Sequence, residues 1–111
     1  MEEFLGFIYQ NRGVLASQRG DFKASGQDYR RALHLNPKLA AAYYNRGNDE
    51  LMQKRYRKAI RDISRALSLS PTDAWALKNR GLAWRGLGEM EKAERDWQLV
   101  QGSEPEYKVP E

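Results

Sequence analysis

The clearest pattern in this chain lies in residues 40–73, AAAYYNRGNDELMQKRYRKAIRDISRALSLSPTD. The tripeptide Asn45-Arg46-Gly47 recurs once before and once after this position, at residues 11–13 and 79–81, with the same spacing each time. A fixed period of this kind is the signature of a repeat protein. The chain is therefore divided into three repeats within a single domain of residues 1–111, which are residues 6–39, 40–73 and 74–107, followed by a short tail of residues 108–111.

Each repeat is predicted to form two helices joined by a short turn. Apolar or small side chains recur every three or four positions in residues 22–33, as an amphipathic helix requires. The second helices should end before the X-Pro pairs, because proline disfavours helix in the residue before it. We expect Gly13 to face Ser25, and Gly47 to face Ala59, so that the two helices of a repeat can approach closely.

The composition limits the classes of protein that the chain can represent. It has 111 residues, of which 41% are hydrophobic and 31% charged, and a net charge of +4. No apolar run reaches the roughly 18 residues that a membrane span needs, so we expect no membrane partner. Cysteine is absent, which excludes disulfides and thiolate metal sites. Residues 1–6 lack the basic start and apolar stretch of a signal peptide, which leads us to expect a cytoplasmic protein.

These residues carry a family resemblance. A 34-residue helical hairpin with glycine in its first helix, an aromatic residue and alanine in its second, and a final proline resembles the tetratricopeptide repeat (TPR), over residues 6–107. The resemblance implies an all-α, right-handed α-solenoid (a superhelix) whose first helices line a concave groove. It also implies a scaffold for protein–protein interaction, binding an extended peptide or a partner protein in that groove. The sequence departs from the family at Arg12, Arg46 and Arg80, which replace a leucine, and at Glu50, which replaces an aromatic residue.

The sharpest groove feature is a ladder of three asparagines, one in each repeat. An asparagine amide has a donor and an acceptor, so it can pair with a peptide bond whatever side chain that peptide carries. The alternative is that each amide only bonds a neighbouring turn of the protein. Tyr44 and Trp75 would add apolar contact, although Trp75 could instead fill a joint between repeats. Lys78 and Arg85 would favour acidic residues in the partner. The complete predicted set is Asn11, Asn45, Asn79, Tyr44, Asn48, Gln10, Trp75, Lys78 and Arg85.

A second binding mode of the family, the carboxylate clamp, grips a C-terminal carboxylate with cations. Phe7, Trp75 and Asn79 occupy the positions that would have to be basic. A terminal carboxylate would therefore lose its charge-assisted hydrogen bonds, and we do not expect this mode.

Two other functions stay open. Only a short segment follows the third repeat, so Trp97, Leu99 and Val100 could form an open C-terminal edge that joins copies into a homo-oligomer. The basic residues within 54–65 could contact nucleic acid, although we favour a solvated outer surface there, with Tyr56 in the core.

Catalysis has little support in the sequence. The chain has one histidine, His34, and none of the motifs that mark a nucleophile, a phosphate loop or a metal site. We therefore expect no enzyme activity, no cofactor and no metal.

Overall fold

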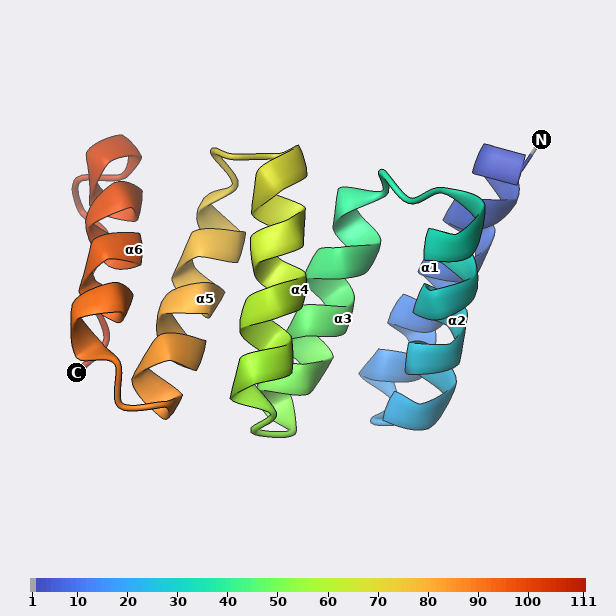
Figure 1. The fold of residues 1–111 in the computed structure, drawn as a ribbon, viewed down its shortest axis with the longest axis horizontal. Coiled ribbons are helices and arrows are strands. Elements are labelled where there is room, and N and C mark those ends of the chain that lie inside the picture. The colour runs from blue at the N-terminus through green and yellow to red at the C-terminus, as the bar shows by residue number, and fades with distance from the viewer. Residues whose placement is uncertain (1) are drawn as a thin grey trace.

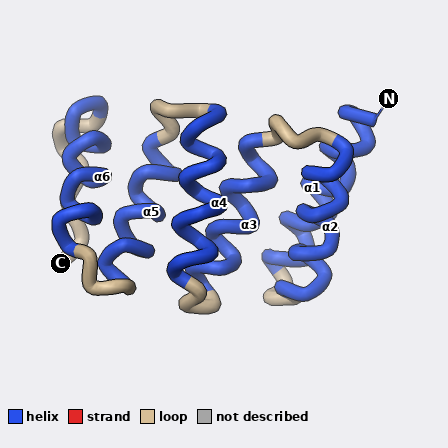
Figure 2. Tube along the Cα trace, in the orientation of Figure 1, coloured by secondary structure: helices blue, strands red, loops and turns tan. Residues whose placement is uncertain are grey.

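The structure is a computed structural model that describes residues 2–111, apart from the side chain of Glu3. Six helices and no strand occur in this part of the chain, which confirms the all-α prediction (Figures 1 and 2). They are α1 (Glu2–Gln18), α2 (Phe22–Leu35), α3 (Ala40–Met52), α4 (Tyr56–Leu69), α5 (Ala74–Gly86) and α6 (Met90–Ser103).

The helices form three antiparallel hairpins placed side by side along the long axis of the molecule (Figure 1). Its principal extents are 40 × 25 × 20 Å. Helix α3 also contacts α1 and α5, so each first helix contacts the first helix of the next hairpin. Stacking of this kind buries the apolar face of each hairpin against its neighbour and makes the domain a helical solenoid.

Local signals fix the helix ends. Asp21 and Asp73 cap α2 and α5, where their carboxylates accept hydrogen bonds from the backbone N–H of Ala24 and Ala76. The turn inside each hairpin needs one residue of positive φ. Repeats one and three use glycine there, but repeat two uses Lys54, with φ of 62°.

The first-helix glycines have a larger neighbour than the one predicted. A Cβ on Gly13 would lie 2.6 Å from the ring of Tyr29, and a Cβ on Gly47 would lie 2.6 Å from the side chain of Ile63. Trp97 lies against the third glycine in the same way. The glycine therefore makes room for a large buried side chain. The nearest atoms to Gly13 belong to Tyr29 rather than to the predicted Ser25, whereas Gly47 lies close to the backbone of Ala59, as predicted, as well as to Ile63.

The apolar core is divided into two clusters. The smaller cluster joins repeat one to the start of α3, and its buried members are Tyr29, Ala32, Leu39 and Ala42. The larger cluster joins repeats two and three, and its buried members are Ala59, Ile63, Leu67, Ala76, Leu77, Ala83 and Val100.

We call the interface between two consecutive repeats a joint. The joint between repeats one and two contains buried polar groups and lies between the two clusters. Asp49 on α3 is only 6% exposed, and its carboxylate accepts hydrogen bonds from the hydroxyls of Ser17 (2.5 Å) and Ser25 (2.7 Å) of repeat one. The corresponding positions of the next joint, one repeat later, are all apolar, namely Leu51, Ala59 and Ala83. The joint between repeats one and two is therefore partly polar where the next joint is apolar.

The C-terminal edge differs from the prediction. Trp97 and Val100 are fully buried, and of the three residues predicted to form an open edge only Leu99 is exposed. Trp97 points into its own hairpin, where its Nε1 donates a hydrogen bond to the carbonyl oxygen of Lys78 (3.3 Å). Tyr107, in the segment that follows α6, packs against the larger cluster. Trp97 and Val100 are therefore not available to another copy of the chain, and Leu99 is the one exposed residue of the predicted edge.

Exposed apolar side chains gather at the other end of the solenoid. Phe4, Phe7 and Ile8 on α1 are each about half exposed or more. Ile8 corresponds to Ala42 of the second repeat, which is buried against the preceding repeat. An uncovered repeat face thus lies on α1. Within the described residues, no helix is both long and apolar enough to cross a membrane.

Candidate peptide-binding face

The asparagine ladder forms hydrogen bonds between consecutive first helices. Asn45 on α3 donates from its amide nitrogen to Oε1 of Gln10 on α1, at 2.7 Å. The amide nitrogen of Gln10 donates in turn to Oδ1 of Asn11, at 3.2 Å. Gln10 is buried, so this chain of amides supports the contact between α1 and α3.

The same arrangement recurs one repeat later. The amide nitrogen of Asn79 on α5 donates to the hydroxyl oxygen of Tyr44 (3.0 Å) and to Oδ1 of Asn48 (2.9 Å), both on α3. Asn45 and Asn79 therefore each bond the preceding repeat. The sequence suggested two possibilities, namely asparagines that are free to bind a peptide and asparagines that bond a neighbouring turn. The bonds between repeats are a third.

Each of the four asparagines on this face keeps hydrogen-bonding groups that have no partner among the described residues. These are the side-chain oxygens of Asn45 and Asn79 and the amide nitrogens of Asn11 and Asn48. Two acceptors and two donors on one face suit a peptide backbone, which presents both kinds of group. Bonds to neighbouring helices hold Asn45, Asn48 and Asn79 in fixed orientations, whereas Asn11 is bonded by Gln10 of its own helix.

Aromatic side chains flank this face. Trp75 is 65% exposed, so it does not fill a joint between repeats. Tyr44 is half-buried and packs against the larger cluster, where its hydroxyl stays available to Asn79. Apolar contact with a ligand is therefore available mainly from Trp75.

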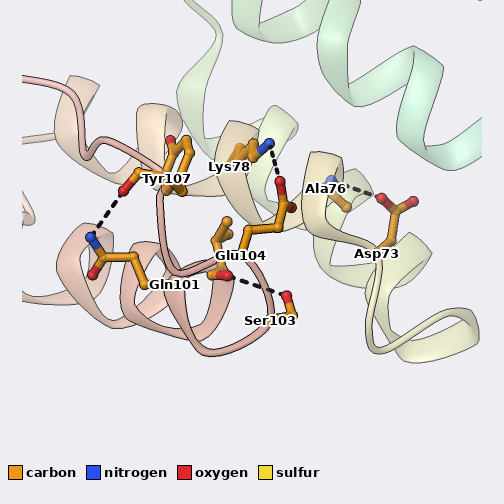
Figure 3. Close-up of polar contacts among 8 residues, drawn as sticks. Asp73, Ala76, Lys78, Gln101, Ser103, Glu104 and Tyr107 are labelled. Atoms are coloured by element: carbon orange, nitrogen blue, oxygen red, sulfur yellow. Dashed lines mark hydrogen bonds and ion pairs between the residues drawn. The ribbon is translucent and has the colours of Figure 1, made fainter.

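Lys78 is not the free cation that the sequence suggested (Figure 3). Its Nζ lies 3.3 Å from Oε1 of Glu104, and its side chain is only 16% exposed. The ammonium also lies over the rings of Trp75 (4.5 Å) and Tyr107 (4.9 Å). Tyr107 is held by a hydrogen bond from Gln101 to its backbone oxygen. The segment that follows α6 therefore neutralises the cation that was predicted to attract acidic residues.

Arg85 lies seven residues after Lys78 on the same helix, α5. Its guanidinium carbon is 6.0 Å from the centroid of the Trp97 ring, and it sits in the last turn of α5.

The predicted basic surface of residues 54–65 lies on the turn before α4 and on α4 itself. Its Lys and Arg side chains are exposed. Tyr56 packs against the larger apolar cluster, as predicted. These cations belong to the second-helix side of the solenoid.

Three ion pairs with buried aspartates were missed by sequence reasoning. Arg12, Arg46 and Arg80 each form two hydrogen bonds to one carboxylate of the second helix in the same repeat, at 2.6–3.0 Å, and these carboxylates are Asp28, Asp62 and Asp96. The hydrogen bonds to Asp62 raise the pKa of Arg46. The pairs explain why arginine replaces the family's leucine. The signal was available, because the three aspartates share the period of the repeat.

The fold and these contacts define a class, the solenoids of stacked helical hairpins. The sequence matches two profiles, one described as "Tetratricopeptide repeat" over residues 40–73 and one described as "TPR repeat" over residues 17–48. The chain belongs to the tetratricopeptide repeat family.

Solved structures show the same fold. The Arabidopsis OM64 TPR domain is 22% identical over 98% of this chain and 90% of that chain, with a TM-score of 0.92. The second TPR domain of human RPAP3, in complex with the HSP70 peptide SGPTIEEVD, is 24% identical over 98% and 91%, with a TM-score of 0.91. MamA is 25% identical over 90% of this chain and 58% of that chain, with a TM-score of 0.86. No curated protein sequence matches the chain.

Proposed function

We propose that this protein is an interaction scaffold, and that it holds an extended segment of a partner polypeptide along the face formed by α1, α3 and α5. The observation that carries the proposal is the set of fixed amides on that face. Asn45 and Asn79 are oriented by bonds to the preceding repeat and keep their side-chain oxygens for a ligand. A binding surface that is already ordered loses less conformational entropy when the ligand arrives.

The chemistry of recognition follows from the remaining groups. The oxygens of Asn45 and Asn79 would accept hydrogen bonds from backbone N–H groups of the ligand. The amide nitrogens of Asn11 and Asn48 would donate to its carbonyl oxygens. Backbone pairing of this kind depends little on the ligand's side chains, and the exposed Trp75 would supply a preference for an apolar residue.

The structural relatives support a peptide ligand, but this chain lacks the cations with which a carboxylate clamp would bind the end of such a peptide. The first TPR of Spaghetti (RPAP3) is bound to the HSP90 peptide SRMEEVD, and the second TPR domain to an HSP70 peptide. In this chain Phe7, Trp75 and Asn79 occupy the positions where a carboxylate clamp needs cations, and Lys78 already pairs with Glu104. We therefore propose an internal extended segment as the ligand, without an acidic terminus and without catalysis.

The test begins by selecting ligands from a peptide display library against the intact domain. The affinity of the selected peptides is then measured by fluorescence polarisation for the domain and for the variant Asn11→Ala/Asn45→Ala/Asn79→Ala. Each lost hydrogen bond contributes roughly 0.5–1.5 kcal/mol, so the variant should bind at least about tenfold more weakly. Gln98→Ala is the matched control, since it removes an exposed amide from α6.

Circular dichroism must first show that the variants are equally helical. The proposal is supported when the triple variant loses affinity and Gln98→Ala does not. Peptides that bind the triple variant as tightly as the intact domain would show that the asparagines only connect the helices.

A further inference from the structure

A second candidate site lies on the side of α3 that faces the second helices. A cleft of about 740 Å³ opens there between α2, α3 and α4. Figure 1 shows α2 and α4 on the same side of the molecule, with α3 between and behind them. The asparagines of the proposed peptide face are absent from its lining. The cleft is therefore separate from that face.

The lining of the cleft is strongly basic. It contains six Lys or Arg side chains and three carboxyl groups. Arg46 is paired with Asp62, and Asp49 accepts the two serine hydroxyls of the polar joint. Five exposed cations remain that form no ion pair with another described residue, namely Lys23, Arg30, Arg55, Lys58 and Arg61.

The cleft exists because small and polar residues replace the apolar residues of the next joint. Gly26, Glu50 and Gln53 line it, and the corresponding residues of the following repeat are Ile60, Trp84 and Leu87. Ile60 packs against the larger apolar cluster. A Cβ added to Gly26 would meet nothing within 4 Å. The space that apolar side chains occupy in the second joint is thus left open in the first.

Glu50 on the floor of the cleft adds an acceptor. Its Oε1 is buried and has no hydrogen-bond partner among the described residues. Burial, followed by the neighbouring Asp62, raises the pKa of Glu50 to about 8. The group is therefore largely neutral at pH 7 and does not repel an anion, while Oε1 can accept a hydrogen bond from a backbone N–H.

We propose that this cleft binds an acidic segment of a partner protein, an extended stretch of about four residues that carries at least two Asp or Glu side chains. The length follows from the part of α2 that lines the cleft, residues 22–30, which spans about 12 Å at roughly 1.5 Å per residue. An extended peptide rises about 3.3 Å per residue. Carboxylates on alternate residues would meet the cations at the rim, and a backbone N–H would meet Glu50 on the floor.

The lining favours a peptide over nucleic acid. Proteins that hold single-stranded nucleic acid combine a basic groove with several aromatic side chains on which the bases stack, and Phe22 is the one aromatic residue among those lining the cleft. A phosphate backbone also has no N–H to offer to Glu50. An acidic peptide satisfies both the cations and the orphaned oxygen.

The test measures binding of a fluorescein-labelled peptide of alternating glutamate and glycine, with its glutamine counterpart as the uncharged probe. Polarisation is recorded at low ionic strength, because exposed charges are screened by salt. The glutamate peptide should bind the intact domain, and the glutamine peptide should bind at least about tenfold more weakly.

The decisive variant is Gly26→Ile, which fills the cleft and removes no charge. It should weaken binding at least about tenfold while leaving the domain folded, since isoleucine is a better helix former than glycine. Gly102→Ile is the matched control, because a Cβ there also meets nothing within 4 Å and the residue lies on α6. This control should bind as the intact domain does.

A second pair of variants separates a built site from diffuse attraction. Arg30→Gln/Arg61→Gln removes two cations of the cleft, whereas Arg57→Gln/Arg95→Gln removes two exposed cations that do not line it. Net charge falls equally in both variants, so attraction by net charge alone would weaken binding equally in both. If the cleft itself binds the peptide, only Arg30→Gln/Arg61→Gln should abolish binding. Equal losses in the two pairs, or full binding by Gly26→Ile, would overturn the proposal.

Two further measurements complete the test. If a short single-stranded oligonucleotide binds more tightly than the glutamate peptide, and Gly26→Ile abolishes that binding, the cleft is a nucleic-acid site and the proposal is wrong. The triple asparagine variant should bind the glutamate peptide normally. Failure at one face is therefore distinguishable from failure at the other.

Discussion

Replacing Asp49 by alanine tests the polar joint between repeats one and two. The Asp49 carboxylate is 6% exposed and accepts two serine hydroxyls. A hydrogen bond to a charged group stabilises by about 1.5–3 kcal/mol. Ser25 keeps a second acceptor, the backbone oxygen of Phe22 at 3.2 Å, so chiefly the Ser17 hydroxyl is left without an acceptor. We expect Asp49→Ala to lower the free energy of unfolding by about 2–3 kcal/mol.

A companion variant, Ser17→Leu/Ser25→Ala/Asp49→Ala, copies the residues of the second joint. It removes the buried charge together with both hydroxyls that depend on it, which is often neutral or stabilising. A leucine side chain gains about 1.5–3 kcal/mol when fully buried, and Leu51 at the corresponding position is half-buried. We expect this variant to recover about 1–2 kcal/mol of the loss and to approach the stability of the intact domain.

Both changes are measured by urea unfolding followed by circular dichroism, with Glu94→Ala on the exposed side of α6 as control. In a domain of 111 residues, 1 kcal/mol shifts the melting temperature by about 4 °C. An Asp49→Ala domain within about 0.5 kcal/mol of the parent would refute the role given to the network. A companion variant less stable than Asp49→Ala would show that the joint cannot accept the apolar pattern.

Three further predictions concern single groups. Because the pKa of Glu50 is raised from 4.5 to about 8, the unfolded chain loses this proton first. The stability that Glu50 contributes is therefore lost as pH rises from 4.5 to about 8. Urea unfolding at several pH values should show this decline in the free energy of unfolding, and Glu50→Gln should flatten it. An unchanged slope against pH in this variant would contradict the raised pKa of Glu50. Arg80→Leu should cost about 3–5 kcal/mol, since it leaves the Asp96 carboxylate buried without its cation, and a cost below about 1 kcal/mol in thermal melts would count against a structural pair. Tyr107→Ala should cost about 1–3 kcal/mol because it uncovers part of the larger apolar cluster, and a melting temperature equal to the parent's would show that Tyr107 does not cover this cluster.

The fold could be predicted because it is encoded by a period. Each hairpin repeats the same apolar positions, turn and final proline, so each repeat gave independent support for the helices of the others. The glycines show the limit of this approach. The period identified Gly13 and Gly47 as positions where the two helices of a repeat approach closely. Only the three-dimensional packing shows that Tyr29 and Ile63 lie against these glycines.

The site was predicted less completely, because its contacts join different repeats. Asn45 bonds Gln10 and Asn79 bonds Tyr44, each across 35 residues, and such pairs depend on how neighbouring hairpins are staggered. Lys78 is paired by Glu104, which the sequence places after the last helix. A repeat pattern does not contain these offsets, so it could name the ladder residues but not their partners.

The division of the core also determines which part of the chain should open first. In a solenoid, the free energy of unfolding is approximately the sum of a term for each repeat and a term for each interface between neighbouring repeats. The interface between repeats one and two is partly polar. Helices α1 and α2 should therefore exchange their amide hydrogens faster than α4 and α5, through openings that cost less than global unfolding. The two proposed ligands would both bridge this interface, from opposite sides of α3. Each would suppress the same opening, so binding at one face should favour binding at the other even without direct contact between the ligands.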